Sequence, residues 1–183
     1  MFVDIAHRDN FGRVAGYAGR LGARLILSSL ASRQPFWMSR EFDAVAALCP
    51  KVQKPAVHIV LTPPKSAEFS DYQFRLVTLW LCKRIGLDGR QLVAWRHDDA
   101  AHSHVHVLAN RVSPMAEVSS LWLKGQAIRR FQEDVQRIFY SSDIDLLKVC
   151  VQVREVEASV LLPAEFDVDE FEVDMWDVDD ECV

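Results

Sequence analysis

Stretches rich in aliphatic and β-branched residues recur along the chain between turn-forming residues, a pattern typical of strands. Other segments repeat their apolar residues every three to four positions, which is typical of helices packed on one face. Strands are expected at residues 23–28, 56–62, 91–96, 103–109 and 149–156. Helices are expected at residues 39–48, 70–85 and 123–139.

Turn and cap residues support these boundaries. Pro63 and Pro64 follow one strand, while Ser70 and Gly86 are residue types that begin and end helices. Only a short polar turn at residues 97–102 separates two of the strands, so we expect these two strands to form an antiparallel hairpin. The order of the elements predicts an α+β fold, in which helices flank a central antiparallel sheet.

The composition is that of an ordinary globular domain. Of 183 residues, 50% are hydrophobic and 26% are charged, which excludes wholesale disorder. No run approaches about 20 consecutive apolar residues, so we expect no transmembrane helix, and we expect no signal peptide. The four cysteines lie far apart without a CxxC pair, and we expect them to be reduced thiols of a cytoplasmic protein.

Charge divides the chain into a body and a tail. Residues 164–183 hold ten acidic residues and no Lys or Arg, which leaves 21 basic and 16 acidic residues in the body, residues 1–163. The net charge of +5 on the body suits a polyanionic partner. The tail alternates acids with apolar residues. We expect it to be disordered, to dock another protein, to add a strand to a sheet edge, or to occupy the body's own nucleic-acid groove as a mimic.

Four of the six histidines fall within ten positions, and their spacing indicates a metal site. His104 and His106 are two residues apart in an expected strand, so their side chains share one face, while Val105 points toward the core. His97 ends the preceding strand and can reach the same face. Three imidazoles without a fourth protein ligand leave coordination positions open, as in catalytic sites. His102 breaks the alternation and is not counted as a ligand.

The alternative is a group of surface histidines on an exposed hairpin. Asp99 favours the metal site over this alternative, because its carboxylate can accept a ring N–H from a ligand histidine and fix the tautomer. Asp99 is also the nearest candidate, by sequence, for a catalytic base.

Several segments together resemble the relaxase/mobilisation nuclease family, the nicking enzymes of plasmid mobilisation within the HUH endonuclease group. His97 to Val112 is similar to its metal motif, H-x-D, a few residues, H-x-H, aliphatics and then N-R-V. Weaker similarities lie in residues 54–61, a strand with a histidine, and residues 70–87, a helix ending in glycine. Residues 11–24 resemble the N-terminal motif that carries the nucleophilic tyrosine, here Tyr17.

The resemblance implies a specific chemistry. Tyr17 would attack a DNA phosphate and remain attached to the 5′ end. His97, His104 and His106 would hold Mg²⁺ or Mn²⁺, although three imidazoles do not exclude Zn²⁺. The expected partner is single-stranded or hairpin DNA at the transfer origin of a bacterial plasmid or mobile element, with an accessory mobilisation protein. Ala100 departs from the family, which often has a hydroxyl residue there, and the acidic tail is not part of its pattern.

Basic and aromatic residues are candidates for DNA contact. We expect three arginines to contact DNA phosphates: Arg24, Arg96 and Arg111. The last two flank the histidine hairpin. Tryptophans either stack on unpaired bases or fill the core, which is the commoner role; the candidates are Trp37, Trp95 and Trp122. His58 is expected to be a buried strand residue.

Two other functions stay open at this point. One is an HUH replication initiator or transposase, in which the nucleophile follows the metal motif and would be Tyr140. The other is a DNA-binding or partner-binding relative that does not nick. Tyr72 is expected to be a packing or surface residue.

Overall fold

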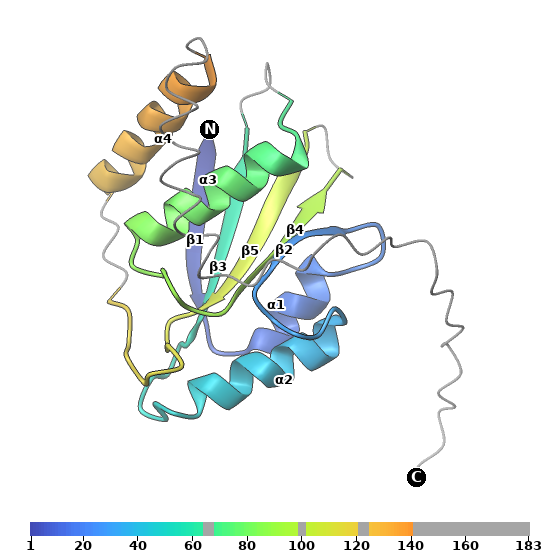
Figure 1. Cartoon of the computed structure of the whole chain (residues 1–183), viewed down its shortest axis with the longest axis vertical. Coiled ribbons are helices and arrows are strands. Elements are labelled where there is room, and N and C mark those ends of the chain that lie inside the picture. Colours follow the sequence, from blue (N-terminus) through green and yellow to red (C-terminus); the bar gives the residue numbers. More distant parts are fainter. Residues whose placement is uncertain (64–67, 99–101, 121–124, 141–183) are drawn as a thin grey trace.

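The computed structural model describes residues 1–63, 68–98, 102–120 and 125–140. Its centre is a five-stranded sheet in the order β1-β3-β5-β4-β2, and every neighbouring pair is antiparallel. Four helices flank the sheet, with α3 crossing it in Figure 1 and α1 and α2 lying together at its lower end. The predicted α+β class with a central antiparallel sheet is confirmed.

The strands agree closely with the hydrophobic pattern. They are β1 (Phe2–Arg8), β2 (Arg24–Ser28), β3 (Ala56–Thr62), β4 (Leu92–His97) and β5 (His104–Asn110). The hydrophobic pattern missed β1, which lies at the edge of the described sheet and pairs there with β3. Charged residues at Asp4 and Arg8 interrupt its apolar pattern, and such residues are common on edge strands. The strand expected at residues 149–156, Trp122 and the acidic tail lie outside the described residues.

The helices are α1 (Phe11–Ala18), α2 (Pro35–Ala46), α3 (Asp71–Arg84) and α4 (Gly125–Tyr140). Ser70 caps α3 in a capping box with Gln73, and Gly86 follows with φ +74°, as the sequence indicated. Helix α2 begins four residues earlier than expected from Ser39. Pro35 starts it because a proline presets the helical φ and has no N–H to leave unpaired.

The sheet has a separate apolar core on each face. Helices α3 and α4 cover one face, where Val105 and Val107 of β5 are fully buried. Helices α1 and α2 cover the other face, where Leu108 packs with Trp95 and Phe42. Successive residues of β4 and β5 therefore face opposite layers of the molecule.

The hairpin predicted around residues 97–102 is present. β4 and β5 pair antiparallel, with His97 opposite His104 and Trp95 opposite His106. The three histidines therefore share the α1–α2 face with Trp95.

None of the described helices combines the length and the hydrophobicity that a membrane-spanning helix needs.

Candidate functional site

The three candidate ligands meet at one end of the α1–α2 face. A ring nitrogen from each of His97, His104 and His106 lies within 4.8 Å of the others. His97 and His106 are 2% and 4% exposed, and His104 is partly exposed. The three side chains come from the end of β4 and the start of β5, so hairpin pairing alone brings them together.

Each of these rings has one nitrogen placed next to a protein group. His97 Nε2 is 2.6 Å from the carbonyl oxygen of Ala18, and His104 Nδ1 is 3.3 Å from that of His102. A carbonyl oxygen only accepts hydrogen bonds, so these nitrogens carry the proton in neutral rings. The remaining nitrogen of each ring is then the one suited to hold a metal.

His106 gives the clearest indication of a ligand. Its Nε2 is buried and has no hydrogen-bond partner among the described residues, while its Nδ1 is 2.9 Å from Nε2 of His58. Burial, with the nearby His58, His97, His104 and Arg20, lowers the pKa of His106 to about 3. A buried ring nitrogen left unpaired is unusual in a folded protein, and the neutral imidazole is the form that binds a divalent metal. These residues therefore fit a metal ion.

His58 contacts this cluster although sequence analysis did not place it there, because it was expected to be a buried strand residue. It lies on β3 beside β5, half-buried, with its ring stacked on His106 at 5.1 Å. Burial and the neighbouring Arg8 lower the pKa of His58, so it too is neutral. When Nε2 of His106 is the ligand, Nδ1–H of His106 donates to Nε2 of His58, which fixes the ring in place. The pairing of β3 with β5 brings the two histidines together, and the one sign of it in the sequence is the weak family resemblance of residues 54–61.

Tyr17 lies beside these rings near the end of α1. Its ring is edge-on to His106 at 5.3 Å and to His58 at 6.4 Å, and its side chain is 52% exposed. The two glycines that flank this part of α1 differ in the space around them. Gly16 borders open space, but a Cβ at Gly19 would lie 2.7 Å from the Pro35 ring.

Arg20 is a second residue that sequence analysis did not single out at this site. Its guanidinium lies 5.1 Å from the centre of the Tyr17 ring, and its charge contributes to the low pKa of His106. The side chain is exposed. Arg20 therefore brings a positive charge to the point where Tyr17 and the histidines meet.

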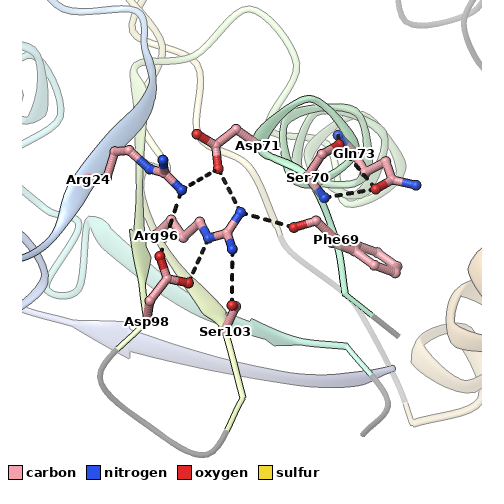
Figure 2. A network of polar contacts seen from close by, with 8 residues as sticks. All are labelled: Arg24, Phe69, Ser70, Asp71, Gln73, Arg96, Asp98 and Ser103. Carbon is pink, nitrogen blue, oxygen red and sulfur yellow. Dashed lines mark hydrogen bonds and ion pairs between the residues drawn. The ribbon is translucent and has the colours of Figure 1, made fainter. Parts of the chain in front are cut away.

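Arg96, an expected DNA contact, lies on the opposite face of the sheet. Figure 2 shows it at the centre of a network with Asp71 from α3, Asp98 and Ser103. Its guanidinium also donates to the carbonyl oxygen of Phe69 at 3.0 Å. Hydrogen bonds to Asp98 and Asp71 outweigh burial and raise the pKa of Arg96. Arg96 joins the start of α3 to both strands of the histidine hairpin.

The other two predicted DNA contacts are placed differently. Arg24 pairs with Asp71 at 3.0 Å and with Asp98 at 3.7 Å, and its side chain stays 56% exposed. Arg111 follows the far end of β5 and donates to the carbonyl oxygens of Ser119 and Lys54. The structure therefore does not bring Arg111 to the histidines, and contact of these arginines with DNA stays a prediction.

The remaining candidates are distributed as follows. Trp95 is 2% exposed and belongs to the core, while Trp37 is 55% exposed at the start of α2. Asp99 lies outside the described residues, as does the side chain of Tyr140 at the end of α4.

Comparison with known proteins adds one finding to this geometry. A family model described as "Relaxase: MobA/VirD2-like, nuclease domain" matches residues 18–138, about two thirds of the chain. The matched range begins one residue after Tyr17 and includes the three candidate ligands and His58. No curated protein matches the chain.

Proposed function

This chain belongs to the MobA/VirD2-like relaxase nuclease family, whose members nick DNA, and on that premise we propose that it cuts one strand of a transfer origin through Tyr17. The substrate is single-stranded or hairpin DNA, and an accessory mobilisation protein is expected beside it. The observation that carries the proposal is the orphaned Nε2 of His106, which lies among His97, His104 and the ring of Tyr17.

His97, His104 and His106 would hold the metal. Mg²⁺ or Mn²⁺ is proposed from the family, and Zn²⁺ also suits three imidazoles. A divalent ion held there supplies Lewis-acid polarisation of a phosphate oxygen. The protein's own contribution is orientation, because Ala18, His102 and His58 each hold the non-ligating nitrogen of one ring.

Tyr17 supplies the nucleophile. Its hydroxyl oxygen attacks phosphorus, a phosphotyrosyl bond forms and the bond from phosphorus to the 3′ oxygen breaks. The products are a free 3′ hydroxyl and a DNA 5′ end on Tyr17, so one phosphodiester replaces another and the step can reverse. Tyrosine is protonated at neutral pH, so its proton must leave. Asp99 is our proposed acceptor, or else it orients a ligand histidine.

Arg20 is positioned to support this step. Its positive charge next to the Tyr17 ring favours the phosphate that approaches this ring. Arg24, with its largely exposed side chain, is the expected contact for a phosphate further along the strand. Arg96 and Arg111 already donate hydrogen bonds to protein groups, so they would contact DNA only through N–H groups that these bonds do not use.

The test is incubation of the full chain with Mn²⁺ and single-stranded origin DNA. We expect a covalent adduct on tryptic peptide 14–20, which contains Tyr17, and no adduct with Tyr17→Phe. The Tyr17→Phe chain should still bind the DNA, since it loses only the attacking oxygen.

Tyr140→Phe is the matched control, and this variant should form the adduct at the normal rate. An adduct that persists in Tyr17→Phe and disappears in Tyr140→Phe would instead indicate an initiator-type or transposase-type enzyme. Absence of any adduct from the wild type would indicate a binding protein.

A further inference from the structure

The stretch from residue 10 to residue 40 has an uneven charge, of which the proposed chemistry uses only Arg20 and Arg24. It contains five arginines and no Asp or Glu, although acids are more numerous than bases in the whole chain; the arginines are Arg13, Arg20, Arg24, Arg33 and Arg40. The stretch forms α1, β2 and the first half of α2. A polyanion is the partner that such a one-sign segment suits.

The same stretch exposes large apolar side chains. Besides Tyr17, the exposed fractions are 103% for Leu21, 58% for Phe36 and 55% for Trp37. Phe36 and Trp37 contact each other edge-on at 5.0 Å, and the Arg40 guanidinium lies 5.2 Å from the Phe36 ring. We refer to Leu21, Phe36, Trp37 and Arg40 as the α1–α2 surface.

Packing of α2 does not need this surface. The helix uses its other side, Met38 and Phe42, for the core, and Phe42 stacks on Phe11 of α1 at 4.8 Å. Pro35, Met38 and Phe42 lie on one helical face, so Phe36 and Trp37 point away from it. Exposed aromatic residues next to arginines are typical of binding sites rather than of structural surfaces.

The α1–α2 surface begins next to the proposed nucleophile. Gly19 follows α1 and contacts the Pro35 ring so closely that a Cβ at Gly19 would be 2.7 Å from it. The first turn of α2 therefore lies against the end of α1, two residues from Tyr17. Ala18, between Tyr17 and Gly19, accepts the hydrogen bond from His97.

We propose that the α1–α2 surface binds the single-stranded flank of the nick site, with unpaired bases stacked on Phe36 and Trp37 and backbone phosphates on Arg40 and Arg20. Aromatic rings bind bases of any sequence through their faces, and guanidinium groups bind the phosphates between them. Duplex bases are already stacked on one another, so the surface distinguishes single strands from duplex. The inference rests on the proposed function, because a nick site with a single-stranded flank exists only if the chain nicks DNA at Tyr17.

The experiment measures affinity separately from nicking. The probe is a 5′-fluorescein oligothymidylate of 15 nucleotides, titrated with the full chain by anisotropy at two salt concentrations. The variants are Phe36→Ala with Trp37→Ala, and Phe36→Tyr with Trp37→Tyr, which keeps two rings. Tyr72→Ala is the matched control, because Tyr72 is an aromatic residue of similar exposure, 53%, on α3 over the other face.

We expect the double alanine variant to bind about tenfold or more weakly, since each stacked base contributes that order of affinity. The tyrosine variant and Tyr72→Ala should stay within about twofold of the wild type. With 5-iododeoxyuridine in the oligonucleotide, irradiation should cross-link tryptic peptide 34–40, which carries both aromatic residues. Circular dichroism checks that each variant is folded.

Wild-type affinity in the double alanine variant would overturn the inference, and so would no binding of the oligothymidylate by the wild type. A protein partner for this surface would give the first of these results. The proposed function is scored separately by the Tyr17 adduct: normal nicking with unchanged affinity refutes only the α1–α2 surface. Loss of affinity in the alanine variant without any adduct in the wild type refutes only the nicking.

Discussion

The histidine hairpin carries two polar clusters, one on each face of the sheet, and they differ in how completely they are paired. On the α3 face, Arg96 bonds to two carboxylates, a hydroxyl and a carbonyl oxygen (Figure 2). On the α1–α2 face, the neighbouring His97 belongs to a cluster in which His106 Nε2 is buried and finds no partner in the part of the chain that the structure describes. Adjacent residues of one strand thus belong to clusters of opposite kind.

The difference separates a structural role from a binding role. A polar cluster that satisfies its own hydrogen bonds holds elements together, as Arg96 joins α3 to the hairpin. A buried polar atom left unpaired has a free-energy cost of about 1–3 kcal/mol, which a ligand can remove. Variants of one cluster should therefore change either metal binding or stability, and not both.

The largest effect is expected from His104→Ala combined with His106→Ala. Bound Mn²⁺ should be lost, and nicking should fall about a thousandfold or more, since metal stabilisation of the transition state amounts to several kcal/mol. The thermal midpoint without metal should not fall, because the Arg96 cluster is untouched. The measurements are elemental analysis and the adduct assay.

His102→Ala is the control for this double variant, because His102 contributes only its backbone carbonyl oxygen to the cluster. Full metal content in the double variant would show that the metal binds elsewhere.

Arg96→Met breaks the opposite cluster. The variant removes one of the two arginines that Asp71 and Asp98 share and leaves only the more exposed Arg24, and we expect the free energy of unfolding to fall by about 1.5–3 kcal/mol. Urea unfolding measures this loss. The more exposed pair of Arg84 and Asp134 is the comparison, because Arg84→Met should lower the free energy of unfolding by less than about 1 kcal/mol.

At saturating Mn²⁺, the folded Arg96→Met variant should bind as much metal per chain as the wild type. Unchanged stability together with a loss of DNA affinity would return Arg96 to the role of a phosphate contact.

His58 tests the link between the ligands and their support. His58→Phe keeps a ring against His106 but removes the acceptor, so Mn²⁺ affinity should fall about 10- to 100-fold. His58→Gln places an amide oxygen where Nε2 was and should restore most of that affinity. Calorimetric titration of both variants distinguishes them, and equal losses would mean that His58 only fills space.

The smallest effect concerns pH and Asp98. Hydrogen bonds from Ser103 and Arg96 lower the pKa of Asp98 in the folded chain, so its contribution to stability is present above the ordinary aspartate range. That contribution disappears as the pH falls through the lowered value. Asp98→Asn should therefore lose less stability than the wild type between pH 6 and pH 3, measured as urea midpoints. Parallel pH profiles would remove Asp98 from the network.

Local sequence predicted the hairpin well, because alternation over a few residues decides which side chains share a face. It placed His104 and His106 together and Val105 in the core. It could not reveal His58, since the contact with His106 depends on strand pairing across 48 positions. Edge strand β1 escaped for a different reason, because its charged residues hide an apolar alternation.

Arg96 and Trp37 show the same limit. Arg96 was expected to face DNA because it lies next to His97 in the sequence. Neighbouring residues of a strand point to opposite faces, however, so Arg96 lies on the α3 face, toward Asp71. Trp37 was a candidate for either core or DNA. The early start of α2 at Pro35 excludes the core by placing Met38 inside and Trp37 outside, and contact of Trp37 with DNA stays a prediction.

The central claim is that three imidazoles on one face of this hairpin bind one divalent metal ion. Electron spin echo spectroscopy of Mn²⁺ on the full chain, labelled with ¹⁵N-histidine, tests it most directly. We predict coupling to directly bound imidazole nitrogen, reduced in His104→Ala and in His106→Ala and unchanged in His102→Ala. Bound Mn²⁺ that couples only to water protons, with no ¹⁵N signal, would contradict the account.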